Sequence, residues 1–223
     1  MEVVTLPSFL EDHDNLIKEK YINASCVIAG QVVQKNAMPF FENKKENLSE
    51  FLLSLYVFAG LNYPRFYKMD DLCKLGWLAS EILLLGNLQP GKFLPEETGL
   101  VLANANSSLD TDLKYWDTVK EEPSPSLFVY TLPNVLQGEI CIRNNFKGES
   151  AFFVFEEFNS SFMEKYVTSL LDNNRLSVCI MGWVELVRER YKAVLFKVEK
   201  EKGENPIPFT IENINKLFQS ANE

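Results

Sequence analysis

The segment that begins at Gly99 most constrains the fold of this chain. It opens with a short apolar run, GLVLA over residues 99–103, which fits a strand buried on both faces. A small polar turn over 104–108 follows, and Leu113, Trp116 and Val119 then recur at helical spacing. A strand, a tight turn and an amphipathic helix in this order form an α/β unit. The sequence therefore predicts an α/β fold.

Three further elements are expected before this unit. The run YINASCVIAG over 21–30 combines small and β-branched residues, and it predicts the opening strand of a parallel sheet. Residues 51–56 are expected to form a short helix. From the expected N-cap Asp70, apolar residues recur at helical spacing until Leu83, and Gly86 marks the stop.

The second half of the chain continues the alternation. A helix over 132–142 leads to a strand over 150–155, and Ser161 with Glu164 forms a capping box for the next helix. Strands are expected over 177–183 and 191–198. The short connection between them favours antiparallel pairing, because a parallel crossover needs about a dozen residues. Thr210 is the expected cap of a last helix.

Composition excludes more functions than it proposes. The chain has 223 residues, of which 46% are hydrophobic, so it is most simply a single domain over residues 1–223. A net charge of -9 disfavours binding to nucleic acid or to an anionic membrane surface. The N-terminal segment lacks a secretory leader pattern, and no run approaches the ~20 apolar residues of a membrane helix, which predicts a cytoplasmic protein.

The cysteines and the histidine suggest no metal or redox centre. The four cysteines lie far apart in apolar stretches, so we expect buried, reduced thiols rather than disulfides or metal ligands. The one histidine, His13, lies in the acidic segment EDHD and is expected on the surface. We expect no metal and no cofactor.

The segment over residues 123–155 resembles a known family. It combines a proline-containing loop, a helical face with Asn134, Gly138 and Glu139, and a turn glycine, Gly148, before a buried strand. GLVLANANSSLDTDLKYW lies before it and SVCIMGWVEL after it. In this order the motifs resemble the N-terminal half of a β-ketoacyl synthase.

This resemblance covers roughly residues 21–198 and implies a fold. It implies a thiolase-like half, with a five-stranded, mainly parallel sheet, one antiparallel edge strand and helices on both faces. Gly182, Trp183 and Glu185 stand where the family has a Gly-Gly-x-Glu turn.

The position of the family's nucleophile is vacant. Counting from Gly148 to the end of the next strand reaches Glu157, beside Glu156, where the family has a reactive cysteine. The family's reaction also needs two histidines, or a histidine and an asparagine, from a second half, and the chain ends about where that half would begin. We therefore expect no catalytic residue. Chain-length-factor subunits resemble ketosynthases in which another polar residue replaces the cysteine.

Two interpretations of Glu156 and Glu157 remain open. They have a structural or interface role, or they form an acid/base pair in which like-charge proximity raises one pKa. Consecutive residues at a strand end point in opposite directions, which makes a shared proton awkward. The structural role is favoured.

A group of aromatic and polar residues, with Phe158, is expected beside the vacant position. We expect it to line an acyl tunnel or a partner interface, with a plain hydrophobic core as the alternative. The group consists of Phe128, Tyr130, Thr131, Asn134, Glu139, Phe152, Phe153 and Phe155.

The turn over 104–108 has a second interpretation. It could hold a phosphate at a helix N-terminus. It lacks the glycine and the lysine of a P-loop, so a plain tight turn is favoured.

The resemblance implies a partner protein rather than a free enzyme. A half-length chain leaves the helix after Ser161 and the helix over 132–142 with an uncovered face, and in the intact family the third strand pairs across the dimer axis. We therefore expect a non-catalytic, chain-length-factor-like subunit that pairs with a complete β-ketoacyl-ACP synthase and serves an acyl carrier protein. The pathway would make fatty acids, polyketides or aryl-polyene-type pigments. The alternatives are a homodimer that binds an acyl group or an acyl carrier protein, and a hydrolase that uses Glu157.

Overall fold

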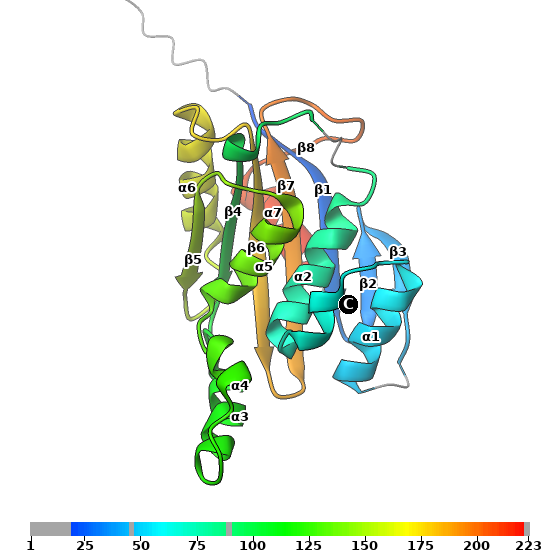
Figure 1. The fold of residues 1–223 in the computed structure, drawn as a ribbon. Helices are drawn as coiled ribbons and strands as arrows, with labels where there is room; N and C mark the ends of the chain where they lie inside the picture. The colour runs from blue at the N-terminus through cyan, green and yellow to red at the C-terminus, as the bar shows by residue number, and fades with distance from the viewer. Residues whose placement is uncertain (1–18, 45–46, 88–90, 221–223) are drawn as a thin grey trace, which may run out of the picture.

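The computed structural model describes residues 19–44, 47–87 and 91–220. His13 lies outside these residues. The described part of the chain alternates strands and helices around one mixed sheet (Figure 1). The strands are β1 (Tyr21–Ala29), β2 (Val32–Lys35), β3 (Met38–Glu42), β4 (Thr98–Asn104), β5 (Ser150–Val154), β6 (Val178–Val187), β7 (Arg190–Glu199) and β8 (Ile207–Pro208). The helices are α1 (Leu48–Phe58), α2 (Asp71–Leu84), α3 (Leu109–Val119), α4 (Pro125–Val129), α5 (Asn134–Asn144), α6 (Ser160–Asp172) and α7 (Ile211–Gln219), with 3-10 turns at Pro64–Lys68 and Pro95–Glu97.

The sheet has eight strands in the order β3-β2-β1-β7-β6-β4-β5, and β8 pairs with β1. β4 is parallel to both β5 and β6, as the α/β unit predicted. The other adjacent pairs are antiparallel. The expected five-stranded, mainly parallel sheet is therefore wrong. A strand buried on both faces reads as a continuous apolar run in any sheet, so its composition does not reveal which strands flank it.

The antiparallel strand is not at the edge. β7 pairs with β6 as predicted, but its other side pairs with β1 over most of its length. The edges are β3 and β5. The expected antiparallel edge strand is therefore wrong. β1, over residues 21–29, pairs with β7 and so places β7 inside the sheet, and β1 does not begin a parallel sheet.

The hairpin of β2 and β3 was not predicted. The turn between β2 and β3 holds Asn36 and Ala37 at positive φ, 51° and 60°, and the turn from β1 into β2 holds Gly30 and Gln31 at positive φ. Glycine and asparagine favour such turns, whereas an alanine at positive φ is rare, so the local signal is weak. The hairpin extends the sheet beyond β1.

Helices cover both faces of the sheet, as expected. α1, α2 and α5 pack on one face, where the largest buried side chains include Trp77, Phe51 and Phe66. α6 and α7 pack on the other face, against Met181, Phe196 and their neighbours (Figure 1). α3 and α4 extend beyond the end of the sheet as an arm.

Two of the three predicted helix caps are confirmed. The Asp70 side chain accepts a hydrogen bond from the Cys73 amide at 2.9 Å, and that of Thr210 accepts one from the Asn213 amide at 3.3 Å. The capping box at Ser161 is wrong. α6 begins earlier, because the Asn159 side chain accepts from the Phe162 amide at 3.0 Å.

The outer surface of α6 also differs from expectation. Its buried residues, Met163, Val167 and Leu171, face the sheet, whereas Lys165 and Ser169 are exposed. α6 therefore does not present a broad uncovered apolar face.

All four cysteines are free thiols, as predicted, but Cys141 is less buried than expected. Cys26, Cys73 and Cys179 are buried, and Cys141 is half-buried. No helix in the described ranges is both long and apolar enough to cross a membrane.

Candidate functional site

A groove marks the position where the resemblance places the nucleophile. Residues 155–159 connect the end of β5 to the start of α6, and the groove beside them has a volume of about 710 Å³. Both Glu156 and Glu157 line it and both are exposed. The other residues described along it are Phe155, Phe158, Asn159, Ser160, Ser161, Asn215, Phe218 and Gln219.

The groove contains little that could catalyse a reaction. No cysteine and no histidine stand among the described residues that line it, so it offers no thiolate or imidazole. Glu156 and Glu157 form no ion pair with another described residue. Two carboxylates open to water lack the desolvation that tunes an acid/base pair.

The C-terminal helix closes one side of the groove, which the sequence did not reveal. The ring of Phe158 stacks on that of Phe218 in α7, with centroids 4.4 Å apart. Trp183 meets Phe158 edge-on at 5.9 Å, and the Lys192 ammonium lies 3.9 Å from the Phe218 centroid. The stacked rings of Phe158 and Phe218 belong to residues sixty positions apart in the chain. In the sequence, this contact was indicated by nothing more than the apolar face of the last helix.

The predicted aromatic group does not form one cluster. Phe152 packs against the core under α2 and α5, whereas Phe153 and Phe155 pack on the α6 side of the sheet. Phe153 contacts the rings of Phe162 and Tyr166 at 4.8 and 5.1 Å. Phe128 lies in the arm, 58% exposed, with its ring 5.4 Å from Tyr115. Consecutive strand residues point to opposite faces, which separates Phe152 from Phe153.

Glu139 and Tyr130 meet on the face opposite α6. Glu139 is 5% exposed, and its Oε1 pairs with Arg65 at 2.9 Å, while its Oε2 is buried without a hydrogen-bond partner in the described structure. Burial raises the pKa of Tyr130 to about 12, helped by the negative charge of Glu139. Burial also raises the pKa of Asp70, which caps α2 and accepts a hydrogen bond from Thr111. The bond from Thr111 to Asp70 joins α3 to the start of α2, and the Arg65–Glu139 pair joins the 3-10 turn at Pro64–Lys68 to α5.

The remaining predicted residues lie nearby. The Thr131 carbonyl accepts a hydrogen bond from the Ser108 hydroxyl at 2.5 Å, and its own hydroxyl donates to Phe128 O at 2.7 Å. Asn134 is exposed at the first turn of α5. Neither residue lines the groove.

The turn over 104–108 already holds an anion of the chain itself. The Glu185 carboxylate accepts hydrogen bonds from the amides of Ala105 at 2.6 Å and Asn106 at 3.3 Å. A phosphate would have to displace this carboxylate, so the phosphate interpretation is wrong. Glu185 lies within β6, where Gly182 allows close packing: a Cβ there would lie 2.0 Å from Val194 O.

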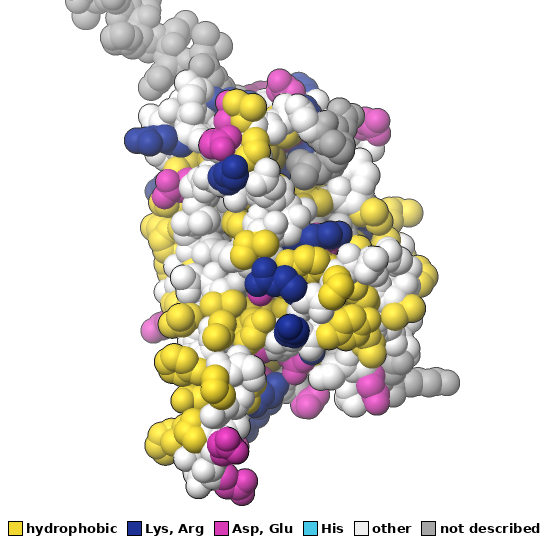
Figure 2. All heavy atoms as spheres, viewed as in Figure 1, with side chains coloured by type: hydrophobic (Ala, Val, Ile, Leu, Met, Phe, Trp, Pro, Cys, Tyr) yellow, Lys and Arg dark blue, Asp and Glu magenta, His cyan; other side chains and the backbone are white. Residues whose placement is uncertain are grey.

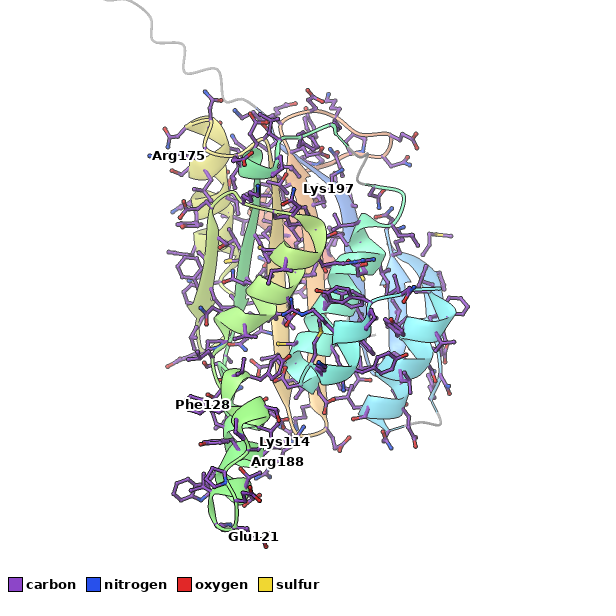
Figure 3. The ribbon with its side chains drawn as sticks, viewed as in Figure 1. Lys114, Glu121, Phe128, Arg175, Arg188 and Lys197 are labelled. Carbon is purple, nitrogen blue, oxygen red and sulfur yellow. The ribbon has the colours of Figure 1, made fainter. Side chains whose placement is uncertain are left out.

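Large hydrophobic side chains gather along one margin of the molecule (Figure 2). They follow the β5 edge and continue down the arm of α3 and α4, where Figure 3 labels Phe128. At the base of the arm, Lys114 pairs with Asp71 at 3.0 Å and with Asp110 at 2.9 Å. The arm is therefore tied to α2. Its exposed apolar residues are Leu109, Leu113, Trp116, Val119, Phe128, Val129 and Leu132, and Val154 is exposed in β5.

Comparison with known proteins shows the fold. No protein-family profile matches the chain, and no curated protein matches it. Among solved structures, the ishigamide ketosynthase/chain length factor matches with a TM-score of 0.61 and 17% identity, over 85% of this chain and 64% of that one. A ketosynthase (ApeO) in complex with its chain length factor (ApeC) from Xenorhabdus doucetiae matches with a TM-score of 0.54 and 11% identity, over 91% of each chain.

A third match is a type II PKS acyl-carrier protein in complex with its ketosynthase (AntDE:AntF), with a TM-score of 0.55 and 13% identity. It covers 81% of this chain and 62% of that one, so the chain spans less than two thirds of two of the three structures. At these identities the likeness establishes architecture alone. The chain has an α/β fold with one mixed sheet, and this fold resembles that of ketosynthase and chain-length-factor subunits.

Proposed function

We propose that this chain is a non-catalytic, chain-length-factor-like subunit that pairs with a complete, cysteine-bearing ketosynthase. The observation that carries the proposal is the apolar margin formed by the β5 edge and the arm. Trp116 is 64% exposed, Phe128 58% and Val154 55%. Exposed apolar residues in this number, beside a strand with a free edge, mark a surface that another chain covers.

The groove supports a role without catalysis. A condensing enzyme needs a thiolate where β5 meets α6, and the described groove offers the carboxylates Glu156 and Glu157 instead. The partner would supply the nucleophile and the groups that decarboxylate the extender unit. This chain would complete the dimer and limit the length of the product.

The biosynthetic setting is part of the same proposal. The likeness to ketosynthase structures that include a chain length factor or an acyl-carrier protein supports a substrate held by such a carrier. One of these structures is a type II PKS complex, which supports a polyketide pathway. Fatty acid and aryl-polyene-type pathways use the same kind of subunit and stay within the proposal.

Co-expression with the ketosynthase encoded nearest to it tests the proposal. We expect the two chains to co-purify at a one-to-one ratio and the pair to elongate acyl chains on the carrier protein, whereas the chain alone should not. Hydrolysis of an acyl thioester to the free acid and thiol by the isolated chain, lost in Glu157→Gln, would support the hydrolase alternative instead. Separate elution of the two chains at micromolar concentration would refute the pairing.

A homodimer is the second candidate, because the same margin can pair with itself about a two-fold axis. Light scattering on the isolated chain distinguishes the two. A stable homodimer that is not displaced by the ketosynthase would favour it, and a monomer that dimerises only with the ketosynthase would exclude it.

A further inference from the structure

A second cavity lies at the end of the sheet opposite the arm. It has a volume of about 670 Å³, within the range of small-molecule sites. Figure 3 shows Lys197, which lines it, far from Arg188 and Lys114 at the arm. The walls come from the start of β1, the β2–β3 turn, the residues after α2 and the segment that follows β7. We call this the lysine cavity.

Two nearly fully buried charged residues form its floor. Lys197 and Glu199 are two positions apart in β7 and are 5% and 2% exposed. The Lys197 ammonium lies 3.0 Å from Glu199 Oε2 and donates to Asn87 O at 2.6 Å. Burying an ammonium and a carboxylate is costly unless they are well paired. A hydrophobic pair would serve a purely structural strand better, so this pair suggests a site that handles charge.

The cavity gathers more positive than negative charge. Three of the described residues that line it are lysines, Lys35, Lys92 and Lys197, against the carboxylates of Glu199 and Glu204. The lining thus carries one surplus positive charge in a chain whose net charge is -9, and Glu201, outside the lining, also pairs with Lys92. A cavity with surplus cationic charge and low-dielectric walls attracts anions.

The lysines retain hydrogen-bonding capacity. An ammonium has three N–H donors. Lys35 donates to Leu85 O, and Lys197 donates to Glu199 and Asn87, so each has at least one N–H beyond these bonds. Burial lowers the pKa of Lys35, in keeping with an ammonium held away from bulk water.

A bulge in β1 brings an amide to the same place. The pairing of β1 with β7 shifts register between Ile22 and Ala24, which sets Asn23 apart from the ladder. The Asn23 side chain donates to Glu199 Oε2 at 2.5 Å and accepts from the Gly203 amide at 2.9 Å. Bulges often redirect a side chain beside a site. Here Asn23, which the bulge positions, donates to the Glu199 carboxylate, so Lys35 and Lys197 are the donors that remain for a ligand.

We propose that the lysine cavity binds a small organic anion through a carboxylate or phosphate group, with Lys35 and Lys197 as its main donors. The site is independent of the groove at residues 155–161 and of the pairing proposed above. Lys92 is bound by Glu199 and Glu201, at 3.3 and 3.5 Å, and so contributes charge more than direct contact.

Calorimetry on the full chain tests this, with citrate as the carboxylate probe and inorganic phosphate as the phosphate probe. Sodium chloride holds the ionic strength constant. We expect saturable binding of at least one probe, and which probe binds identifies the group recognised. Lys35→Met and Lys197→Met should each weaken binding at least tenfold.

Lys200→Met is the matched control, because Lys200 is half-buried like Lys35, does not line the cavity and bonds to Asn174 instead. Its affinity should equal that of the unmodified chain. If Lys197→Met does not fold, the half-buried Lys35 decides the question. No heat with either probe, or equal affinity in Lys35→Met and the unmodified chain, would overturn the proposal.

Discussion

A comparison of Phe128→Ala with Phe153→Ala distinguishes residues of the proposed partner surface from residues of the hydrophobic core. Phe128 is 58% exposed and touches one ring, that of Tyr115. Phe153 is half-buried and contacts three rings, those of Phe155, Phe162 and Tyr166, with centroids 4.8 to 5.8 Å away. The two substitutions remove the same atoms from different surroundings. They should therefore affect different measurements.

The magnitudes follow from burial. A fully buried phenylalanine costs about 3–5 kcal/mol when truncated, so half-buried Phe153 should cost about 2 kcal/mol of unfolding free energy. In a domain of this size that lowers the melting temperature by roughly 4–8 °C. Phe128→Ala should cost less than about 1 kcal/mol of stability. At the centre of an interface the same change weakens association by about 2 kcal/mol, or roughly 30-fold in Kd.

Thermal unfolding and sedimentation equilibrium measure the two effects on the same samples. Association is followed for the pair with the ketosynthase, or for the homodimer if that is what forms. Equal losses of melting temperature in Phe128→Ala and Phe153→Ala would refute the reasoning. So would a Phe128→Ala variant whose association is unchanged, because the arm would then not be the contact surface.

Substitutions at three further positions test how the site is supported. Gly182→Ala places a Cβ 2.0 Å from Val194 O at φ 157°, and the strain and clash should cost ~3–5 kcal/mol, seen as a large drop in the urea midpoint. Glu185→Ala leaves two turn amides without their acceptor and should cost ~2–3 kcal/mol in the same titration, whereas Glu185→Gln keeps an acceptor and should cost less. Because burial raises the pKa of Asp70, the native state binds this proton more readily than the unfolded state, so the contribution of this group to stability falls as pH rises through its raised pKa. Asp70→Asn should flatten the pH dependence of the melting temperature above about pH 4, the ordinary pKa of an aspartate, and an unchanged profile would contradict the assignment.

Local signals predicted the elements that depend on local contacts. The Asp70 cap and the apolar spacing up to Leu83 placed α2 to within a residue or two, because capping and helical periodicity are encoded within a few turns. The antiparallel hairpin of β6 and β7 followed from its short connection.

The sheet order could not be predicted in this way. β1 pairs with β7, which is more than 160 residues away, and nothing in the composition of 21–30 distinguishes that neighbour from a parallel one. The β2–β3 hairpin was missed because Ala37 occupies a turn position that glycine or asparagine usually takes. Long-range pairing depends on the whole core and not on one segment.

The sequence indicated the corner of the fold at which the groove lies, but it did not indicate which residues surround the groove. Counting from Gly148 reached the corner between β5 and α6, and the groove lies there. The alternation of Phe152 and Phe153 across the sheet was readable from the strand period, yet proximity in sequence suggested one cluster. The stacking of Phe158 on Phe218 depends on where α7 docks, which no local pattern specifies.

The outer surface of α6 limits where a partner can bind. Lys165, Ser169 and Asp172 are exposed on this helix. Asp172 pairs with Lys20 at 2.9 Å, but covering Lys165 would remove an ammonium from water, which costs free energy that apolar contacts must offset. At the β5 edge and along the arm, Val154 and Phe128 gain from burial and the free backbone groups of β5 gain hydrogen bonds, while the exposed Asp117 and Glu121 of the arm need polar partners there. A chain that pairs with this one should therefore extend the sheet at β5 and enclose the arm, and not stack on the α6 layer.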